Sequence, residues 1–149
     1  MMISQKCQYA LRSVFELACR LGQGPVRIAD IAEAQAIPPR FLEVILGQLK
    51  QSGFVASRRG AEGGYMLARP AESISMGDVI RFVDGPIAPV KCVQDGEHRE
   101  CPLDGDCVFL DVWKRVQQVT TEIYDQTTMG DLVEEQKART RRFVPNFAI

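Results

Sequence analysis

The feature that most restricts the fold is a pair of short amphipathic segments, residues 27–52, joined by a tight turn. Apolar residues recur in both segments at the spacing of an α-helix. Pro38 and Pro39 open the second segment, where a proline at the first helical position costs no hydrogen bond. The apolar stripes consist of Ile28, Ile31 and Ala32 in the first segment and Phe41, Leu42, Ile45, Leu46 and Leu49 in the second. Two such helices are typical of a helix-turn-helix, although any small helical hairpin has the same pattern.

A β-hairpin is expected directly after the second helix. Gly53 ends that helix, and residues 54–57 and 65–68 are two strand-like runs on either side of a glycine-rich tip. Arg58 and Arg59 at the base of the hairpin are placed for contacts with DNA phosphates or the minor groove. The tip lacks the lysine and hydroxyl residue of a nucleotide-binding loop. A helix-turn-helix with such a hairpin is a winged helix-turn-helix, which predicts double-stranded DNA as the partner.

The most regular part of the chain is a long amphipathic segment near the C-terminus. Its apolar stripe consists of Phe109, Val112, Trp113, Val116, Val119 and Ile123, which spans about four helical turns. A helix with one apolar stripe, added to a unit that has its own core, needs a partner, and we expect the same helix of a second subunit. Packing against the first predicted helix, residues 4–21, is the alternative, and the two are compatible.

Two further helices begin at matching capping sequences. Ser75-Met76-Gly77-Asp78 precedes one and Thr128-Met129-Gly130-Asp131 the other, each with a hydroxyl residue three positions before a carboxylate. Gly85-Pro86 stops the first. We expect two short capped helices and, beyond the second, a flexible basic tail over residues 136–149.

Three of the five cysteines, Cys92, Cys101 and Cys107, lie in one acidic, turn-rich loop. An odd number of cysteines in a protein expected to be cytoplasmic argues against a disulfide framework and favours metal binding or redox chemistry. Soft thiolate ligands suit iron, and three of them can wrap one iron–sulfur cluster. A structural zinc site that includes His98 is the alternative, although the spacing lacks the usual C-x2-C pair.

The charge is divided unevenly along the chain. The net charge is −1, but residues 1–70 carry +4 and residues 71–149 carry −5, so only the first half is expected to face a polyanion. No apolar run is long enough to span a bilayer and no signal pattern opens the chain, so we expect a cytoplasmic protein without membrane contact. A single histidine in an acidic loop supports no catalytic arrangement, so neither an enzyme nor a small-molecule substrate is expected.

Together these features resemble the IscR/NsrR/RirA/CymR group of bacterial winged helix-turn-helix transcriptional regulators. The matching stretches, from about Ile3 to about Glu135, are KCQYALRSV, ADIAEAQAIPPRFLEVILGQLKQSGFV, SRRGAEGGYMLARP, ISMGDVIRFVDG, the cysteine triplet and TTMGDLVEE. The most specific is the wing sequence R-G-x-x-G-G-Y, Arg59 to Tyr65. The resemblance implies a homodimer that swaps its long helices and binds promoter DNA, by default as a repressor.

The same resemblance assigns roles to particular residues. Cys92, Cys101 and Cys107 match the ligands of a 2Fe–2S or 4Fe–4S cluster that senses iron, redox state or nitric oxide. Glu43 and Arg59 match residues that contact or discriminate DNA. The full set of residues expected to contact DNA is Arg40, Glu43, Gln48, Lys50, Arg58, Arg59, Gly60, Gly63 and Gly64.

The chain also departs from that group. Leu110 and Gln8 stand where IscR-like and NsrR-like members have a fourth ligand, and Pro38 replaces a capping serine. The first cysteine gap, of eight residues, is nearer to that of RirA-like members. The candidates for a fourth ligand are His98, Asp95, Asp104, Asp106, Cys7, Gln8 and a small molecule. Two other functions stay open: a winged-helix DNA binder with a zinc or thiol redox switch, and a cluster-free scaffold for protein interactions.

We therefore expect a mainly α fold with a small β-hairpin. Residues 1–85 form the winged helix-turn-helix domain, and residues 86–107 form the cysteine-rich loop that binds the cluster. Residues 108–135 form the dimerisation helix and a short capped helix, and residues 136–149 form the tail.

Overall fold

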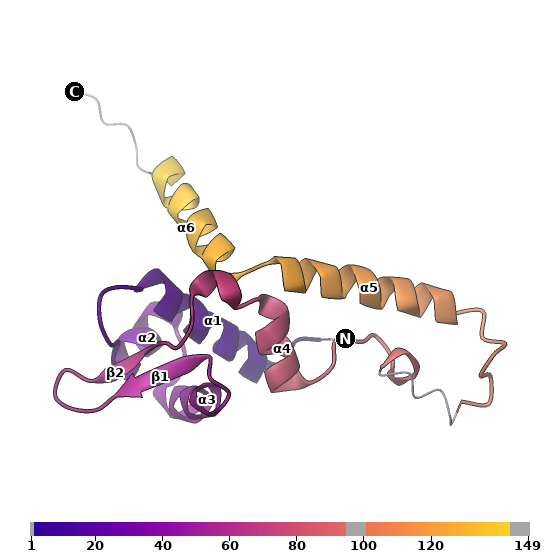
Figure 1. Ribbon diagram of the computed structural model, residues 1–149, viewed down its shortest axis with the longest axis horizontal. Coiled ribbons are helices and arrows are strands. Elements are labelled where there is room, and N and C mark those ends of the chain that lie inside the picture. Colours follow the sequence, from indigo (N-terminus) through magenta and orange to yellow (C-terminus); the bar gives the residue numbers. More distant parts are fainter. Residues whose placement is uncertain (1, 95–100, 144–149) are drawn as a thin grey trace.

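The computed structural model describes residues 2–94 and 101–143. Its helices are α1 (Gln5–Cys19), α2 (Ile28–Gln35), α3 (Pro39–Gln51), α4 (Met76–Asp84), α5 (Leu110–Gln126) and α6 (Met129–Phe143). The strands β1 (Val55–Arg58) and β2 (Gly64–Leu67) and the 3-10 turns η1 (Ala71–Ser73) and η2 (Lys91–Val93) complete the order. Figure 1 shows a compact unit of α1–α4 and the hairpin, from which α5 and α6 leave in different directions. The mainly helical fold with one small hairpin is confirmed.

The core of the compact unit is built around α1, which packs against α2, α3, α4, α6 and β2. The fully buried apolar residues of α1 and α3 are those at helical spacing: Ala10, Val14 and Leu17 on α1 and Leu42, Ile45, Leu46 and Leu49 on α3. Burial of each such side chain is worth about 1.5–3 kcal/mol. This core fixes α3 on the domain, so the remaining faces of α3 are free to contact other molecules.

The hairpin pairs β1 and β2 antiparallel, with Val55 opposite Leu67 and Arg58 opposite Gly64. Val26 exchanges two backbone hydrogen bonds of 2.8 Å with Tyr65, which ties the hairpin to the segment before α2. A Cβ atom on Gly64 would lie 2.4 Å from the Val26 carbonyl oxygen, so this close approach requires glycine. The wing is therefore held to the helix-turn-helix by backbone pairing.

A backbone elbow joins α5 and α6 to the domain. The N–H of Met76 donates to Thr127 (2.9 Å), and the N–H of Met129 donates to Ile74 (2.8 Å). Met129 is fully buried in the core. Both predicted capping sequences form: the carboxylates of Asp78 and Asp131 accept from the backbone N–H groups of Ser75 and Thr128. In return, the backbone N–H groups of the two aspartates donate to the Ser75 and Thr128 hydroxyl oxygens. The C-terminal end of α5 is thus anchored in the winged-helix core.

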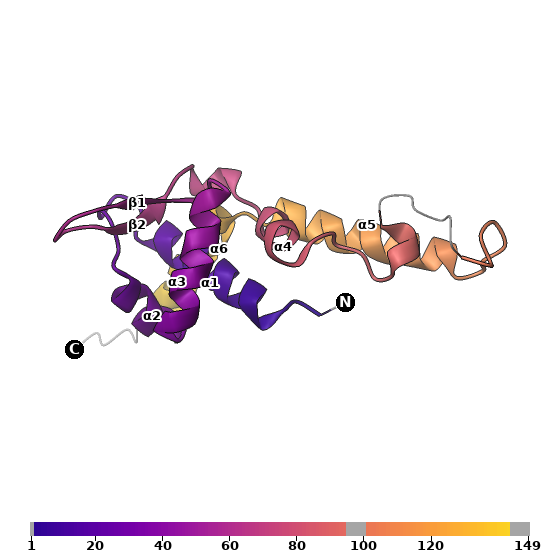
Figure 2. The same ribbon diagram turned by 90° about the horizontal axis from the view of Figure 1, so that it is seen from below.

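Helix α5 projects away from the compact unit (Figures 1 and 2). None of its residues is buried. Five of the six residues of its apolar stripe are exposed, and the sixth, Trp113, is half-buried. The alternative expectation, that this stripe packs on α1, is not met: α5 packs instead against α4 and η2 through other faces. Within residues 2–94 and 101–143, no helix combines the length and hydropathy required to cross a bilayer.

Helix α6 is longer than the short capped helix we expected. It continues to Phe143, so residues 136–143 are helical and do not belong to a flexible tail, while residues 144–149 lie outside the described part of the chain. Its last turns lack an apolar stripe but carry ion pairs of 2.7 Å between Lys137 and Glu134 and 2.8 Å between Arg139 and Glu135. Such pairs at i, i+3 and i, i+4 favour the helical conformation, and a search for apolar periodicity does not detect them.

Helix α1 is shorter than the predicted helix of residues 4–21, and Leu21 lies past its end and is exposed. Cys7 is fully buried with Ile80 and Ile87 in a small second core between α1 and the end of α4.

Candidate nucleic-acid interface and cysteine site

Helix α3 lies along the outer face of the domain, beside the hairpin (Figure 2). Of the residues predicted to contact DNA, Arg40, Glu43 and Lys50 are exposed on α3, and Gln48 is half-buried. Pro39 begins the helix at its first position, where no hydrogen bond is lost. The structure therefore presents a rigid helix whose exposed side chains are of the types that bind phosphates and base edges.

The wing adds two cations beside α3. Arg58 ends β1 and Arg59 begins the turn, and both side chains are exposed. Gly60 has φ 111°, and no described atom lies within 4 Å of the position that a Cβ atom would take. Gly63, in contrast, lies so close to the carbonyl oxygen of Arg58 that a Cβ atom would be 2.2 Å from it. Packing inside the hairpin therefore accounts for Gly63, as it does for Gly64, whether or not either contacts DNA.

Two large apolar side chains of α3 lie at the surface, and one of them, Phe41, was predicted to be buried. Phe41, placed in the buried stripe, is 62% exposed, and Val44 is 60% exposed. The ring of Phe41 lies 6.4 Å from that of Tyr9, centre to centre, at the edge of the core. The i, i+3 spacing puts Phe41 and Val44 on one side of the helix, but Phe41 also stands four positions before Ile45 and so lies at the edge of the buried face.

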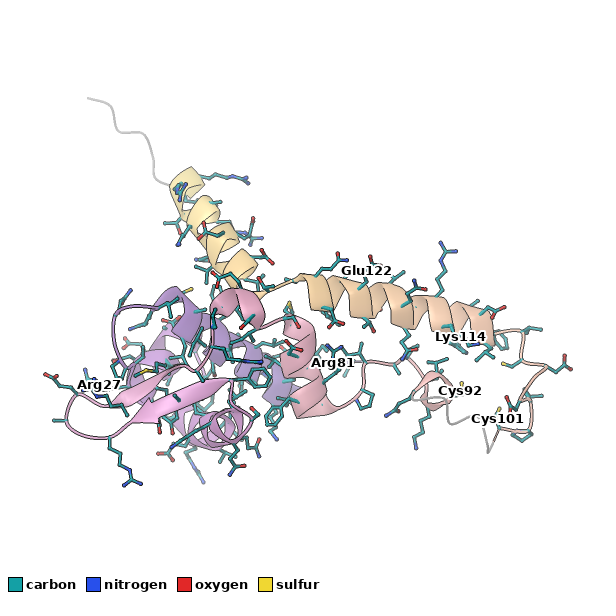
Figure 3. All side chains as sticks on the ribbon, in the orientation of Figure 1. Arg27, Arg81, Cys92, Cys101, Lys114 and Glu122 are labelled. Atoms are coloured by element: carbon teal, nitrogen blue, oxygen red, sulfur yellow. The ribbon has the colours of Figure 1, made fainter. Side chains whose placement is uncertain are left out.

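The cysteine loop lies at the far end of α5 from the elbow. Figure 3 shows Cys92 and Cys101 there, on the side of Lys114 and well away from Arg27 near the hairpin. Cys92 is in η2, which packs against α5 next to the buried Val93, and the carbonyl of Cys107 accepts from the N–H of Leu110 at the start of α5 (3.2 Å). Cys92 and Cys107 are therefore both tied to the N-terminal half of this helix.

All three loop cysteines are free thiols, with Cys101 exposed and the other two half-buried. Within residues 2–94 and 101–143, no three His, Cys, Asp or Glu side chains are close enough to hold a metal ion. The structure thus brings the triplet to one end of the molecule but does not close it into a ligand set. His98 and Asp95, two candidates for a fourth ligand, lie outside the described residues.

The two remaining cysteines differ from the triplet in their surroundings. Burial, with the nearby carboxylate of Asp84 adding to it, raises the pKa of the Cys7 thiol to about 12. Burial also raises the pKa of Cys19, which lies between α1 and α6. A metal ligand must be a thiolate, so a raised pKa makes Cys7 a poor candidate for the fourth ligand.

Contacts at the C-terminal end of α5 join it to α4. Arg81 donates to Asp125 at 2.6 Å, and Gly77 approaches so closely that a Cβ atom there would collide with the Asp125 carboxylate. Together with the elbow, these contacts fix one end of a 17-residue helix on the DNA-binding domain while the other end carries the cysteines. At 1.5 Å per residue, α5 separates these two ends by about 25 Å.

Comparison with known proteins relates the chain to one family of transcriptional regulators. The Rrf2 family, described as "Iron-dependent Transcriptional regulator", matches residues 3–135. The chain is 40% identical over 133 residues to Rv1287 of Mycobacterium tuberculosis (strain H37Rv), whose name assigns it to the HTH-type transcriptional regulators. That alignment covers 89% of this chain and 81% of the relative.

Solved structures agree with the sequence matches. CymR, named the global cysteine regulator of B. subtilis, superposes with a TM-score of 0.75 at 35% identity and covers 91% of this chain and 98% of its own. IscR of T. potens superposes with a TM-score of 0.76 at 31% identity and covers 93% and 90%. These relatives are named as regulators and not as enzymes, which agrees with the expectation from the sequence.

Proposed function

The chain belongs to the Rrf2 family of transcriptional regulators, and on that premise we propose that it is a promoter-binding homodimer, by default a repressor, controlled by an iron–sulfur cluster. The observation that carries the proposal is the joint arrangement on α5: a cysteine triplet at one end and the winged-helix domain fixed at the other.

Support for DNA binding comes from the charge and shape of one face. Arg40, Lys50, Arg58 and Arg59 stand exposed on α3 and the wing, in the half of the chain that carries the positive charge. Cations on a protruding helix and hairpin neutralise phosphates and set the register of the protein on a duplex. Glu43, in the middle of α3, has the acceptor chemistry that suits a cytosine amino group in the major groove.

The donor chemistry of the loop fits an iron–sulfur cluster. Cys92, Cys101 and Cys107 are free thiols, and the described residues of their loop form short turns, so the three thiols can converge around one group. A cluster held there would be a group that oxygen or nitric oxide can modify and that iron scarcity can remove. Asp104, Asp106 and His98 stay as candidates for its remaining ligand.

The chain's own residues supply the coupling to DNA. Cys92 and Cys107 are bound to the start of α5 through η2 and the Leu110 N–H, so ordering of the loop constrains that end of the helix. At the other end, the Arg81–Asp125 ion pair and the Met129 anchor transfer the position of α5 to the domain. In a dimer joined along α5, the position of this helix would set the distance between the two α3 helices. DNA binding requires that this distance match the spacing of the two half-sites.

Arg59→Ala is expected to weaken DNA binding and to lower the slope of log K against log salt by about 1, because one phosphate contact is lost. Titration of a labelled duplex, recovered by selection from a random-sequence pool, at several salt concentrations measures both. Lys114→Ala is the matched control, because Lys114 is also an exposed cation but lies at the other end of the molecule (Figure 3). An unchanged slope for Arg59→Ala would remove this residue from the phosphate contacts.

A second function is favoured by the similarity to the cysteine regulator CymR. In it the same three free thiols, or zinc bound to them, would form the switch. Removal of iron by chelation under anaerobic conditions separates the two. Affinity for the selected duplex changes with loss of iron if a cluster is the switch, and changes only on thiol oxidation or zinc removal if it is not.

A further inference from the structure

We propose that α3 recognises thymine through an apolar contact made by Val44 and Phe41, which would grip the C5 methyl group in the major groove; this rests on the DNA binding proposed above. The two side chains are the large apolar residues that α3 exposes, at 60% and 62%. They stand three positions apart and therefore share one side of the helix. The core is complete without them, because Leu42, Ile45, Leu46 and Leu49 are already buried behind them.

Phe41 is held in place from behind. Its ring packs against Tyr9, and the guanidinium of Arg12 lies 5.7 Å from the centre of the Tyr9 ring. Arg12 in turn donates to the backbone carbonyl of Gln35, at the end of α2. An exposed aromatic ring that packs on a neighbour which is itself held in place loses less conformational freedom on binding, which suits a specificity contact.

The occupant follows from the charges around the pair. Arg40 and Lys50 are exposed on the same helix as this apolar patch, and Arg58 and Arg59 are exposed on the adjoining wing; all four are cations that suit phosphates. Among the groups that a base pair presents in the major groove, the thymine methyl is the apolar one, and aliphatic or aromatic side chains contact it. Duplex DNA therefore suits both features of this surface: its phosphates suit the cations, and its thymine methyl groups suit the apolar patch.

Gly47, one turn after Val44 on the same side, provides an independent observation. Glycine destabilises the interior of a helix more than any residue except proline. Yet no described atom lies within 4 Å of the position that a Cβ atom on Gly47 would occupy. Internal packing therefore does not require glycine there. A smooth helix surface next to Val44 allows a base-pair edge to approach closely.

The test uses the duplex selected from a random-sequence pool, with each thymine replaced singly by deoxyuridine, which removes only the C5 methyl group. We expect one or two positions in each half-site at which affinity falls about fourfold, the effect of burying one methyl group. With Val44→Ala, the ratio of thymine to uracil affinity at one of these positions falls toward one. Leu21→Ala, which truncates an equally exposed apolar residue outside α3, keeps the ratio.

Equal affinity for thymine and uracil at every position would overturn the inference, as would an unchanged ratio in both Val44→Ala and Phe41→Ala. Weaker binding by these variants to all duplexes alike would assign the patch to the sugar–phosphate backbone or to a protein partner, and would also overturn it. Failure of the pool to yield any bound duplex would instead refute the proposed DNA binding.

Gly47→Ala gives a second test, in which stability and DNA affinity are expected to change in opposite directions. We expect its thermal midpoint to rise, because alanine favours the helix, while its affinity for the selected duplex falls. A variant that is more stable and binds equally well would contradict close approach of DNA at this position.

Discussion

Replacement of both Val116 and Val119 by aspartate is expected to convert the protein from a dimer into a monomer while the winged-helix domain stays folded. The two side chains are 42% and 47% exposed on α5, in line with Val112 and Ile123. An apolar stripe of this length, open to solvent on a helix without buried residues, is characteristic of an interface. Carboxylates buried in such an interface would cost several kcal/mol each, more than most dimers can lose.

Sedimentation velocity of both proteins over a range of concentrations measures this effect. The matched control is aspartate at Gln118 and Thr121, on the polar face of the same helix. Because a monomer occupies one half-site at a time, we also expect affinity for the selected duplex to fall by orders of magnitude. A dimer that survives in the apolar-face variant, or a wild-type protein that is monomeric, would contradict dimerisation through this stripe.

The second large effect is expected for Cys92→Ala. Loss of one of three thiolates should abolish cluster binding, and the affinity for promoter DNA should then be the same with and without oxygen. The fold should survive, because Cys92 is a half-buried free thiol and surface substitutions change stability by only about 0.5 kcal/mol. Cys19→Ala is the control: it removes a free cysteine outside the loop, so its iron content and oxygen response should match those of the wild type.

Iron content and duplex titrations under anaerobic and aerobic conditions test this prediction together. If Cys92→Ala keeps its iron, this residue is not a ligand. If the variant loses iron but its DNA binding still responds to oxygen, the proposed coupling between the loop and α3 through α5 is refuted. Cluster binding by the loop would still be supported in that case.

Local sequence signals were sufficient for most of the fold. The helix-turn-helix, the wing and both capping boxes depend on residues close together in the chain, such as Ser75 with Asp78 and Thr128 with Asp131. The signal was weaker where an element depends on charge pairs or on tertiary contacts. Thus α6 is longer than expected because of its ion pairs, and Cys7 is buried by residues of α4 that are distant in sequence.

The candidate site divides in the same way. The sequence identifies the three cysteines. The packing of η2 against α5 and the ion pair between Arg81 and Asp125 depend on the tertiary structure, so the sequence did not predict them. Phe41 shows why apolar periodicity alone is insufficient: it lies at the edge of the buried stripe of α3, where a small rotation of the helix decides between core and surface. Its exposure, together with that of Val44, changes it from a packing residue into a candidate for base recognition.

The central claim is that the cysteine loop holds an iron–sulfur cluster, and one measurement tests it directly: the visible absorption spectrum of protein purified without oxygen, with iron, acid-labile sulfide and zinc determined on the same sample. We predict a brown protein that contains iron and sulfide, with a band shape that distinguishes a 2Fe–2S from a 4Fe–4S cluster. A colourless protein that contains zinc, or no metal even after anaerobic reconstitution, would contradict the claim and leave a winged-helix regulator whose cysteines act as thiols.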